Sequence, residues 1–231
     1  MDYTKRQKTV NIAGSILKRF ELALLIIAFL FVGSTIYDML AFTGQGRGTD
    51  DFKGFEALLK ENPDTVAWIR MDGTHINHPV VQGRDNFEYI DKGFDREFYQ
   101  GGCIFLDEKN AKDLSDNYLI IHGHHMTRGA MFSDVSNYLD ERFFEENTTG
   151  ELLTPNGNYA LTVAGVNIAN AYNDKLYYNE PGMKAPLQFI EDCKFKRSVD
   201  FEDGDKLVLL STCAGDMTND RVVLFCRARR I

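Results

Sequence analysis

The chain has 231 residues, of which 44% are hydrophobic and 26% are charged, and its formal net charge is −8. These values are typical of a globular protein and exclude a disordered or a collagen-like chain. Beyond residue 42 the sequence carries 21 basic and 31 acidic residues. So acidic a domain argues against nucleic acid or anionic lipid as its partner.

The first apolar segment is long enough to cross a membrane. It runs from Leu22 to Tyr37, sixteen residues without a charge, and continues past Asp38 to Phe42. About twenty apolar residues span the ~30 Å hydrocarbon core of a bilayer. We therefore expect a transmembrane signal anchor over residues 20–42. A cleaved signal peptide and a buried helix of a soluble protein are the alternatives, and the former lacks a convincing small-residue cleavage site.

The charges around this segment predict its orientation. Five basic residues precede it, namely Lys5, Arg6, Lys8, Lys18 and Arg19. By the positive-inside rule, residues 1–19 form a cytoplasmic tail, and the chain is a single-pass type II protein of the cell membrane with an extracellular domain. Residues 43–50 are rich in glycine and polar residues, as expected of a flexible linker. Residues 51–231 are long enough for one domain with its own core.

Periodicity and turn residues predict the elements of this domain in chain order. A helix near 51–61 is followed by short strands near 65–73, 78–82, 101–107 and 116–125, and then by a helical segment at 129–147. A hairpin over 150–169, a helical segment at 185–196 and two strands at 205–213 and 221–229 complete the chain. Strands outnumber helices, which favours a mainly β fold, a barrel with helical insertions.

Four cysteines follow the apolar segment: Cys103, Cys193, Cys213 and Cys226. Their spacing matches neither a compact disulfide framework nor a zinc pattern. Cys103 and Cys226 lie within strand-like apolar segments, where a cysteine is usually a small buried hydrophobe. We expect Cys213 to be a free thiol.

The last two predicted strands place a cysteine opposite an arginine. If they pair as a hairpin, Cys213 faces Arg221 and Ser211 faces Val223, with Cβ atoms about 5 Å apart. Cys226 then falls on the other face of the sheet. A fixed positive charge beside a thiol favours the thiolate, which is the nucleophilic form. At these strand ends a barrel rim would be open to a substrate.

A cysteine nucleophile that cleaves an amide also needs a proton donor for the leaving amine, and histidine is the usual choice. Three histidines, His122, His124 and His125, lie at the end of one predicted strand. His122 and His124 are expected to share a face, with His125 pointing away. His75 and His78 flank a turn and are expected at the surface. A solvated turn and a zinc site on the His122/His124 pair are the alternative interpretations.

These residues resemble a known family, the sortases, and class B most closely. The likeness is carried by LSTC with an arginine eight positions after the cysteine, by GHHM followed by GAMF, and by the blocks NPDTVAWIRMDGTHINHPVVQGRDNFEYI and GGCIFLDEKN. It covers residues 50–231, and the N-terminal anchor agrees with it.

The resemblance implies a sortase-like eight-stranded β-barrel with an N-terminal helical portion and an inserted helix, acting without a cofactor or metal. It implies that Cys213 attacks the threonine carbonyl of a C-terminal, NPxT-type sorting signal on a secreted protein. An amine of the cell-wall peptide, or of its lipid-linked precursor, then resolves the thioester. In this family pattern His124 is the general acid and later the base, and Arg221 holds the oxyanion.

The pattern also suggests sorting-signal contacts for Ser211, Asn77 and Val81, although Ser211 fits a barrel wall and Asn77 a turn equally well. Two features depart from the family. No aromatic residue follows Cys213, and His122 stands where tyrosine is common. We expect His122 to be a neutral strand residue, with a part in proton traffic as the alternative.

Other functions fit the sequence less well. A papain-like protease is disfavoured because its cysteine precedes its histidine and lies on a helix. A sortase that polymerises pilins would use the same catalytic residues on other substrates. A non-enzymatic anchored domain that binds metal through His122 and His124 would not depend on Cys213.

Overall fold

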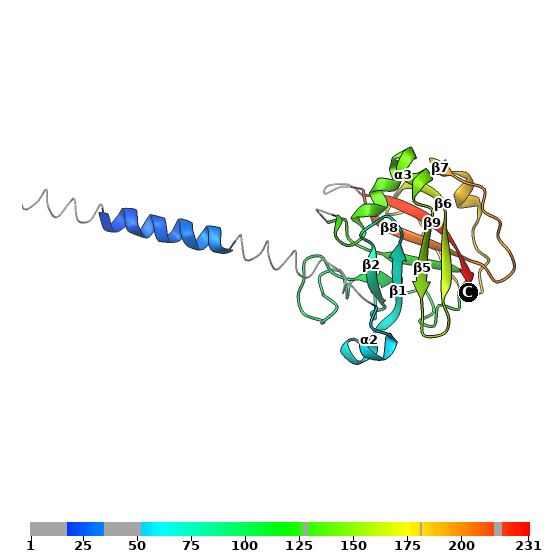
Figure 1. Cartoon of the computed structure of the whole chain (residues 1–231), viewed down its shortest axis with the longest axis horizontal. Coiled ribbons are helices and arrows are strands. Elements are labelled where there is room, and N and C mark those ends of the chain that lie inside the picture. Colours follow the sequence, from blue (N-terminus) through cyan, green and yellow to red (C-terminus); the bar gives the residue numbers. More distant parts are fainter. Residues whose placement is uncertain (1–17, 35–51, 127–128, 181, 215–218) are drawn as a thin grey trace, which may run out of the picture. The chain divides into compact units, whose positions relative to one another are not determined.

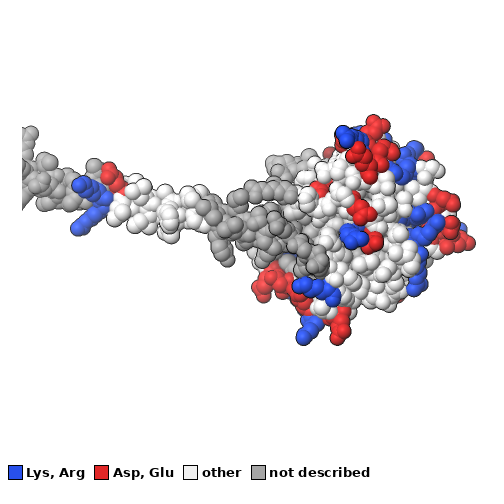
Figure 2. Space-filling view, viewed as in Figure 1, with Lys and Arg blue, Asp and Glu red and all other residues white. Residues whose placement is uncertain are grey.

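The computed structural model describes residues 18–34, 52–126, 129–180, 182–214 and 219–231. The chain divides into two units, Met1–Gln45 and Gly46–Ile231. In the first unit, residues 18–34 form one helix with exposed side chains. Figure 2 shows charged side chains at one end of this helix and uncharged ones along the rest of it.

The expected transmembrane anchor over residues 20–42 is described only in part. Within the described ranges, no helix combines the length and the apolar character needed to cross a membrane. Residues 35–42 of the expected anchor, residues 1–17 of the expected tail and the expected linker over 43–50 lie outside the described residues.

The second unit contains nine strands and four short helices in its described part (Figure 1). The strands are β1 (Thr65–Met71), β2 (Asn77–Val81), β3 (Ile104–Leu106), β4 (Tyr118–His122), β5 (Thr149–Leu153), β6 (Tyr159–Asn170), β7 (Phe195–Lys196), β8 (Lys206–Cys213) and β9 (Asp220–Arg230). The helices are α2 (Phe55–Glu61), the 3₁₀ helix η2 (Ser133–Leu139), α3 (Glu141–Glu146) and α4 (Gln188–Glu191). Eight of these strands are the predicted ones, and the two-residue β7 is additional.

The eight predicted strands close into a barrel. Neighbouring strands follow the order β5-β1-β2-β3-β4-β8-β9-β6, and β6 pairs back with β5 where residues 149–152 lie opposite 159–162. The predicted eight-stranded barrel is therefore confirmed, and β7 pairs with a later part of β6, at Gly165 and Val166. Two neighbouring pairs, β2–β3 and β4–β8, are parallel. Closure removes the free edges that an open sheet would expose.

The helical segment predicted over residues 129–147 is divided into two short helices. The first, η2, ends before Asp140, whose backbone is extended with φ −87° and ψ 126°. The Asp140 side chain then caps α3 by accepting a hydrogen bond from the backbone N–H of Phe143 at 2.9 Å. An extended residue ends one helix and caps the next. The segment predicted over 185–196 likewise contains only the four-residue α4 before β7.

The wall formed by β4, β8 and β9 buries apolar side chains on both faces. Toward the barrel interior it contributes Leu119, Ile121, Val208, Leu210, Val222 and Leu224. On its outer face it contributes Tyr118, Ile120, Leu207, Leu209, Val223 and Phe225. The outer face is covered by residues between β6 and β8, among them Leu176 and Ile190. Because side chains alternate along a strand, the odd-numbered residues of β8 point outward.

Candidate active site

The parallel pair β4–β8 brings two predicted groups of residues to one edge of the wall. His122 ends β4 and Cys213 ends β8, and the register places His122 beside Ser211. The antiparallel partner β9 places Arg221 opposite Cys213 and Val223 opposite Ser211. The register predicted for the last hairpin is therefore confirmed.

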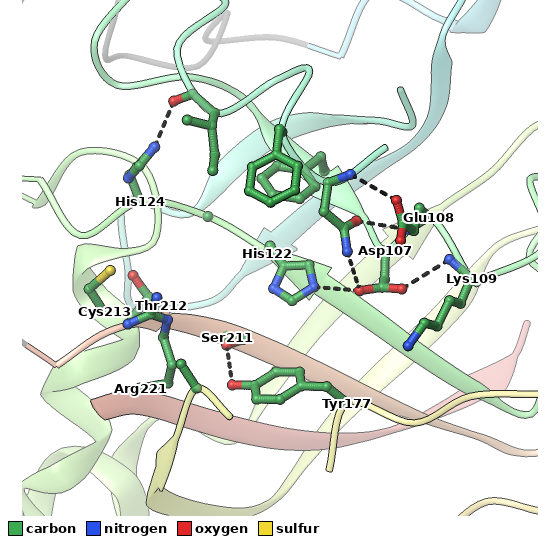
Figure 3. Close-up of a pocket in the computed structure, with 16 residues that line it drawn as sticks. Asp107, Glu108, Lys109, His122, His124, Tyr177, Ser211, Thr212, Cys213 and Arg221 are labelled. Carbon is green, nitrogen blue, oxygen red and sulfur yellow. Dashed lines mark hydrogen bonds and ion pairs between the residues drawn. The ribbon is translucent and has the colours of Figure 1, made fainter. Parts of the chain in front are cut away.

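A pocket of about 370 Å³ lies at this edge. It is lined by Cys213, His124 and Arg221, the three predicted catalytic residues, and also by Ser211 (Figure 3). Since odd-numbered residues of β8 point outward, the pocket lies on the outer face of the wall. The sequence suggests substrate entry at the open rim of the barrel. In the structure, strand alternation places the pocket on the outer face of the wall, at the ends of β4 and β8.

Gly123 allows the chain to leave β4 close to the core. A Cβ atom at this position would lie 2.7 Å from Cγ of Phe132 and closer still to Ile104, so a larger residue would force these core side chains to move. The backbone N–H of Phe132 donates to the carbonyl oxygen of His124 at 3.0 Å. The backbone of His124, the predicted general acid, is thus positioned by Gly123 before it and by the hydrogen bond from Phe132.

The imidazole of His124 is held by a backbone carbonyl. Its Nε2 lies 2.6 Å from the carbonyl oxygen of Ile90, in the segment between β2 and β3 (Figure 3). Because a carbonyl oxygen only accepts, Nε2 carries a proton, and Nδ1 of the neutral ring has a free lone pair. Such a ring can take up a proton at Nδ1 and release it again, which is what general acid–base catalysis requires.

Cys213 differs from the other three cysteines. All four are free thiols, and only Cys213 is partly exposed. Burial raises the pKa of Cys103, Cys193 and Cys226 to about 12. Cys226 belongs to the interior cluster, on the opposite face from Cys213, as predicted. Cys213 is therefore the thiol placed to react with a molecule in the pocket.

The guanidinium of Arg221 makes few hydrogen bonds within the described part of the protein. Its Nη1 donates to the backbone carbonyl of Asp220 at 3.2 Å, and in the described part of the chain its guanidinium enters no ion pair. Burial raises the pKa of the nearby Tyr177, while the charge of Arg221 acts in the opposite direction. The remaining N–H groups of Arg221 can donate to a carbonyl oxygen of a bound substrate.

His122 has a carboxylate partner that sequence reasoning missed. Its Nε2 lies 3.0 Å from Oδ2 of Asp107, and the two side chains are 21% and 5% exposed. The antiparallel pairing of β3 with β4 places Phe105 opposite His122, which brings Asp107 close. The only signal in the sequence was the position of Asp107 at the end of a predicted strand. His122 was expected to be a strand residue without a special role, and its pairing with Asp107 was not foreseen.

Ser211 is the one predicted substrate contact that lines the pocket. Its Oγ lies 2.9 Å from the hydroxyl oxygen of Tyr177, which comes from the segment between β6 and β7. No motif in the sequence pointed to Tyr177. It reaches the pocket only because this segment covers the outer face of β8.

Asn77 and Val81 lie elsewhere. The Asn77 side-chain oxygen accepts a hydrogen bond from Nε1 of Trp68 at 2.7 Å, and Val81 is fully buried against Phe105. Neither is among the described residues that line the pocket. The positions suggested by the family pattern serve packing and a local hydrogen bond in this structure.

The remaining histidines divide differently from the expectation. His75 is exposed and pairs with Asp134 at 2.8 Å, but His78 is 4% exposed, contrary to its predicted surface position. Because β2 begins at Asn77, His78 is already part of the strand, where it lies opposite Ile69 of β1. Ile69 belongs to the interior cluster, so His78 points inward as well. Burial lowers the pKa of His78 to about 4. His125 approaches Ser136, at 3.3 Å, and is not a pocket-lining residue.

A zinc site on the His122/His124 pair would need a third ligand, and the described residues supply none. There, no group of three or more His, Cys, Asp and Glu side chains is arranged to hold a metal ion. The Nε2 atoms of the two histidines face different partners, Asp107 and the carbonyl of Ile90.

Comparison with known proteins gives consistent relatives, although no protein-family model matches the chain. Sortase B of Staphylococcus aureus is 31% identical over 184 residues, which make up 77% of this chain and 75% of that protein. The X-ray structure of Clostridium perfringens sortase B has a TM-score of 0.69 at 28% identity and covers 76% of this chain and 100% of its own. Spy0129, a Streptococcus pyogenes class B sortase involved in pilus biogenesis, has a TM-score of 0.68 at 27% identity, with 77% and 98% covered.

Proposed function

The chain belongs to the sortases, which are cysteine transpeptidases, and is most similar to class B; from this premise we propose its substrates and the roles of its pocket residues. It cleaves a C-terminal sorting signal of the NPxT type after the threonine. It then transfers the secreted protein to an amine of the cell-wall peptide or of its lipid-linked precursor. One observation carries this proposal: Cys213, His124 and Arg221 line a single pocket although His124 is distant from the other two in sequence.

The first half-reaction forms the acyl-enzyme. The thiolate of Cys213, which lies opposite Arg221 in the hairpin, attacks the threonine carbonyl and forms a C–S bond. Arg221 donates hydrogen bonds to the oxygen as negative charge develops there. His124 gives its Nδ1 proton to the leaving amine as the C–N bond breaks. The product is a thioester on Cys213.

The second half-reaction releases the enzyme. An acceptor amine attacks the thioester carbonyl, a new amide forms and the thiolate of Cys213 leaves. The amine must lose a proton in this step, and the family pattern gives that proton to His124. No cofactor is required by these steps.

We place the enzyme at the cell membrane, as a single-pass type II protein with its catalytic domain outside the cell. This is supported by the sixteen uncharged residues from Leu22 to Tyr37 and by the basic residues that precede them. The described part of this segment is helical. In this position the pocket meets secreted proteins as they leave the membrane.

A second candidate function is pilin polymerisation. The structural likeness to the pilus-associated Spy0129 favours it, since that protein covers as much of this chain as the Clostridium perfringens enzyme does. The two functions differ in the acceptor, which is a wall-peptide amine in one case and the lysine of another pilin in the other.

The test uses the full chain in detergent with fluorogenic NPxTx and LPxTG peptides, and the Cys213→Ala protein as control. We expect cleavage after threonine in an NPxT peptide and a thioester adduct on Cys213 by intact mass, both absent from the control. Wall-type amines such as triglycine and a pilin-derived lysine peptide then separate the two acceptors. Cleavage that persists in Cys213→Ala, or no cleavage and no adduct with any peptide, contradicts the proposal.

A further inference from the structure

The pocket contains a second histidine that the reaction described above does not use. His122 lies beside Ser211 in the parallel register of β4 and β8 and lines the same pocket as Cys213. Two residues along a strand span about 6.6 Å and neighbouring strands lie about 4.8 Å apart, so the α-carbons of His122 and Cys213 are about 8 Å apart. This separation leaves room for a small second substrate between the imidazole and the sulfur.

A buried carboxylate holds the ring of His122. Oδ2 of Asp107 lies 3.0 Å from Nε2 of His122 and accepts a hydrogen bond from Nδ2 of Asn86 at 2.8 Å. Oδ1 accepts one from the backbone N–H of Lys109 at 3.0 Å. Burial raises the pKa of Asp107, but the hydrogen bonds, that from His122 foremost, hold it below its usual value. Asp107 is therefore an anion at neutral pH, and within the described residues its one ion-pair partner is His122.

This pairing determines which nitrogen of His122 is free. A carboxylate only accepts, so Nε2 carries a proton and Nδ1 of the neutral ring has the lone pair. Phe105 and Tyr177 pack against the ring, with centroids 5.2 and 5.9 Å from it, and limit its rotation. Figure 3 shows His122 between Asp107 and the side of the pocket that holds Cys213. The free nitrogen is thus directed away from Asp107, toward the place where the thioester forms.

The two histidines of the pocket have different partners and are suited to different proton transfers. His124 is bonded to the carbonyl of Ile90, which carries no net charge. His122 faces the anion Asp107, which stabilises the imidazolium formed when the ring takes up a proton. The pair with Asp107 therefore places His122 to receive a proton from a molecule in the pocket, whereas His124 is left to serve the leaving amine.

On the basis of the proposed transpeptidation, we propose that His122 is the general base of the second half-reaction and that Asp107 is its positioning residue. The nitrogen of the acceptor amine bonds to the thioester carbon, and Nδ1 of His122 takes one proton from that nitrogen. The C–S bond breaks and its electron pair leaves on the sulfur of Cys213. The products are an amide, a thiolate and an imidazolium, which gives its proton to solvent. His122 thus replaces His124 in the step that the family pattern assigns to His124, and His124 serves the first half-reaction alone.

The experiment measures the two half-reactions separately in the full chain. His122→Gln keeps a side-chain N–H for Asp107 but cannot take up a proton, and Asp107→Asn removes the charge while keeping the shape. Acylation is followed as growth of the thioester mass on Cys213, and transfer as its decay on adding triglycine. In His122→Gln we expect acylation within about threefold and transfer about 100-fold slower. In Asp107→Asn transfer slows by about tenfold, because the base remains.

A matched control and a second amine distinguish a chemical role from a structural one. His75 also pairs with a carboxylate, Asp134 at 2.8 Å, but is not among the residues that line the pocket, so His75→Gln should leave both half-reactions unchanged. Hydroxylamine is a weakly basic amine that is already neutral at pH 7 and depends less on a base. The transfer defect of His122→Gln should therefore be about tenfold smaller with hydroxylamine than with triglycine.

Three results would overturn the inference: equal losses in acylation and transfer, equal defects with the two amines, or no loss of transfer. If His122→Gln fails to fold, Asp107→Asn decides by the same three criteria. If the unaltered chain forms no thioester with any sorting peptide, the proposed function itself fails, and the two failures are distinguishable.

Discussion

The two faces of β8 differ in function: one packs into the barrel interior and the other lines the pocket. Val208 and Leu210 point into the barrel, where both are fully buried, whereas Ser211 and Cys213 point outward into the pocket, which the buried Thr212 also lines. The outer layer covers Leu209 but leaves the end of the strand open. Alternation therefore separates stability from chemistry, and a residue's parity along β8 predicts which of the two its replacement affects.

The same contrast applies to two histidines. His78 points into the interior, where burial lowers its pKa to about 4 and keeps it neutral. His122 lies on the outer face and is paired with Asp107 at 3.0 Å. An imidazole without a charged partner is compatible with the core only as the neutral base. One with a carboxylate beside it can accept a proton.

The largest expected difference between the faces is between two cysteines. Cys213→Ala should lose all turnover and all thioester formation, because it removes the nucleophile, while its unfolding free energy stays nearly unchanged. Cys226→Ala should keep activity but lose about 1 kcal/mol of stability, as one heavy atom is removed from a packed core. Peptide cleavage and urea titration measure the two effects. Rapid labelling of any cysteine other than Cys213 by iodoacetamide in the folded chain would contradict the assignment.

The next largest effect concerns neighbouring histidines. His124→Ala should lower acylation by about 1,000-fold, within the range for loss of a general acid. His125→Ala should change it by less than about threefold, since its side chain approaches Ser136 and does not line the pocket. Single-turnover thioester formation is the measurement. The reverse ranking would leave the family membership intact but would show that the general acid is His125.

Arg221 should have a smaller but still large effect. Arg221→Ala removes donors to the developing oxyanion and should lower kcat/KM by about 100-fold, equivalent to about 2.7 kcal/mol. Arg221→Lys keeps the charge but not the planar donors, so only part of the activity should return. A peptide-cleavage series with both variants checks this. Full activity in Arg221→Ala would remove Arg221 from the mechanism.

The barrel and the central constellation could be predicted because they depend on local patterns. Period-2 alternation gave the strands, and the register of the last hairpin follows from the chain on either side of one short loop. Asp107 and Tyr177 could not be predicted, since they reach the pocket through the pairing of β3 with β4 and through the covering of β8 by a distant segment. The burial of His78 was missed because the turn before it ends one residue earlier than its polar sequence suggests.

The smallest expected effect is the pH dependence caused by His78. Its folded pKa of about 4 lies below the ordinary histidine value of 6.5, so the unfolded chain binds the proton first as the pH falls. Stability should therefore fall by about 1.4 kcal/mol per pH unit between about 6.5 and 4, or about 2 kcal/mol from pH 7 to pH 5. Above pH 6.5 His78 contributes no slope.

Trp68, the one tryptophan of the chain, is buried on strand β1, so its fluorescence in urea titrations at pH 7, 6 and 5 reports the unfolding of this domain. His78→Leu removes the titrating group from the interior and should flatten the pH dependence. His75→Gln, at a side chain that is 79% exposed, should retain it. If His78→Leu keeps the full slope, the acid sensitivity arises from other groups and the interior tolerates a protonated His78.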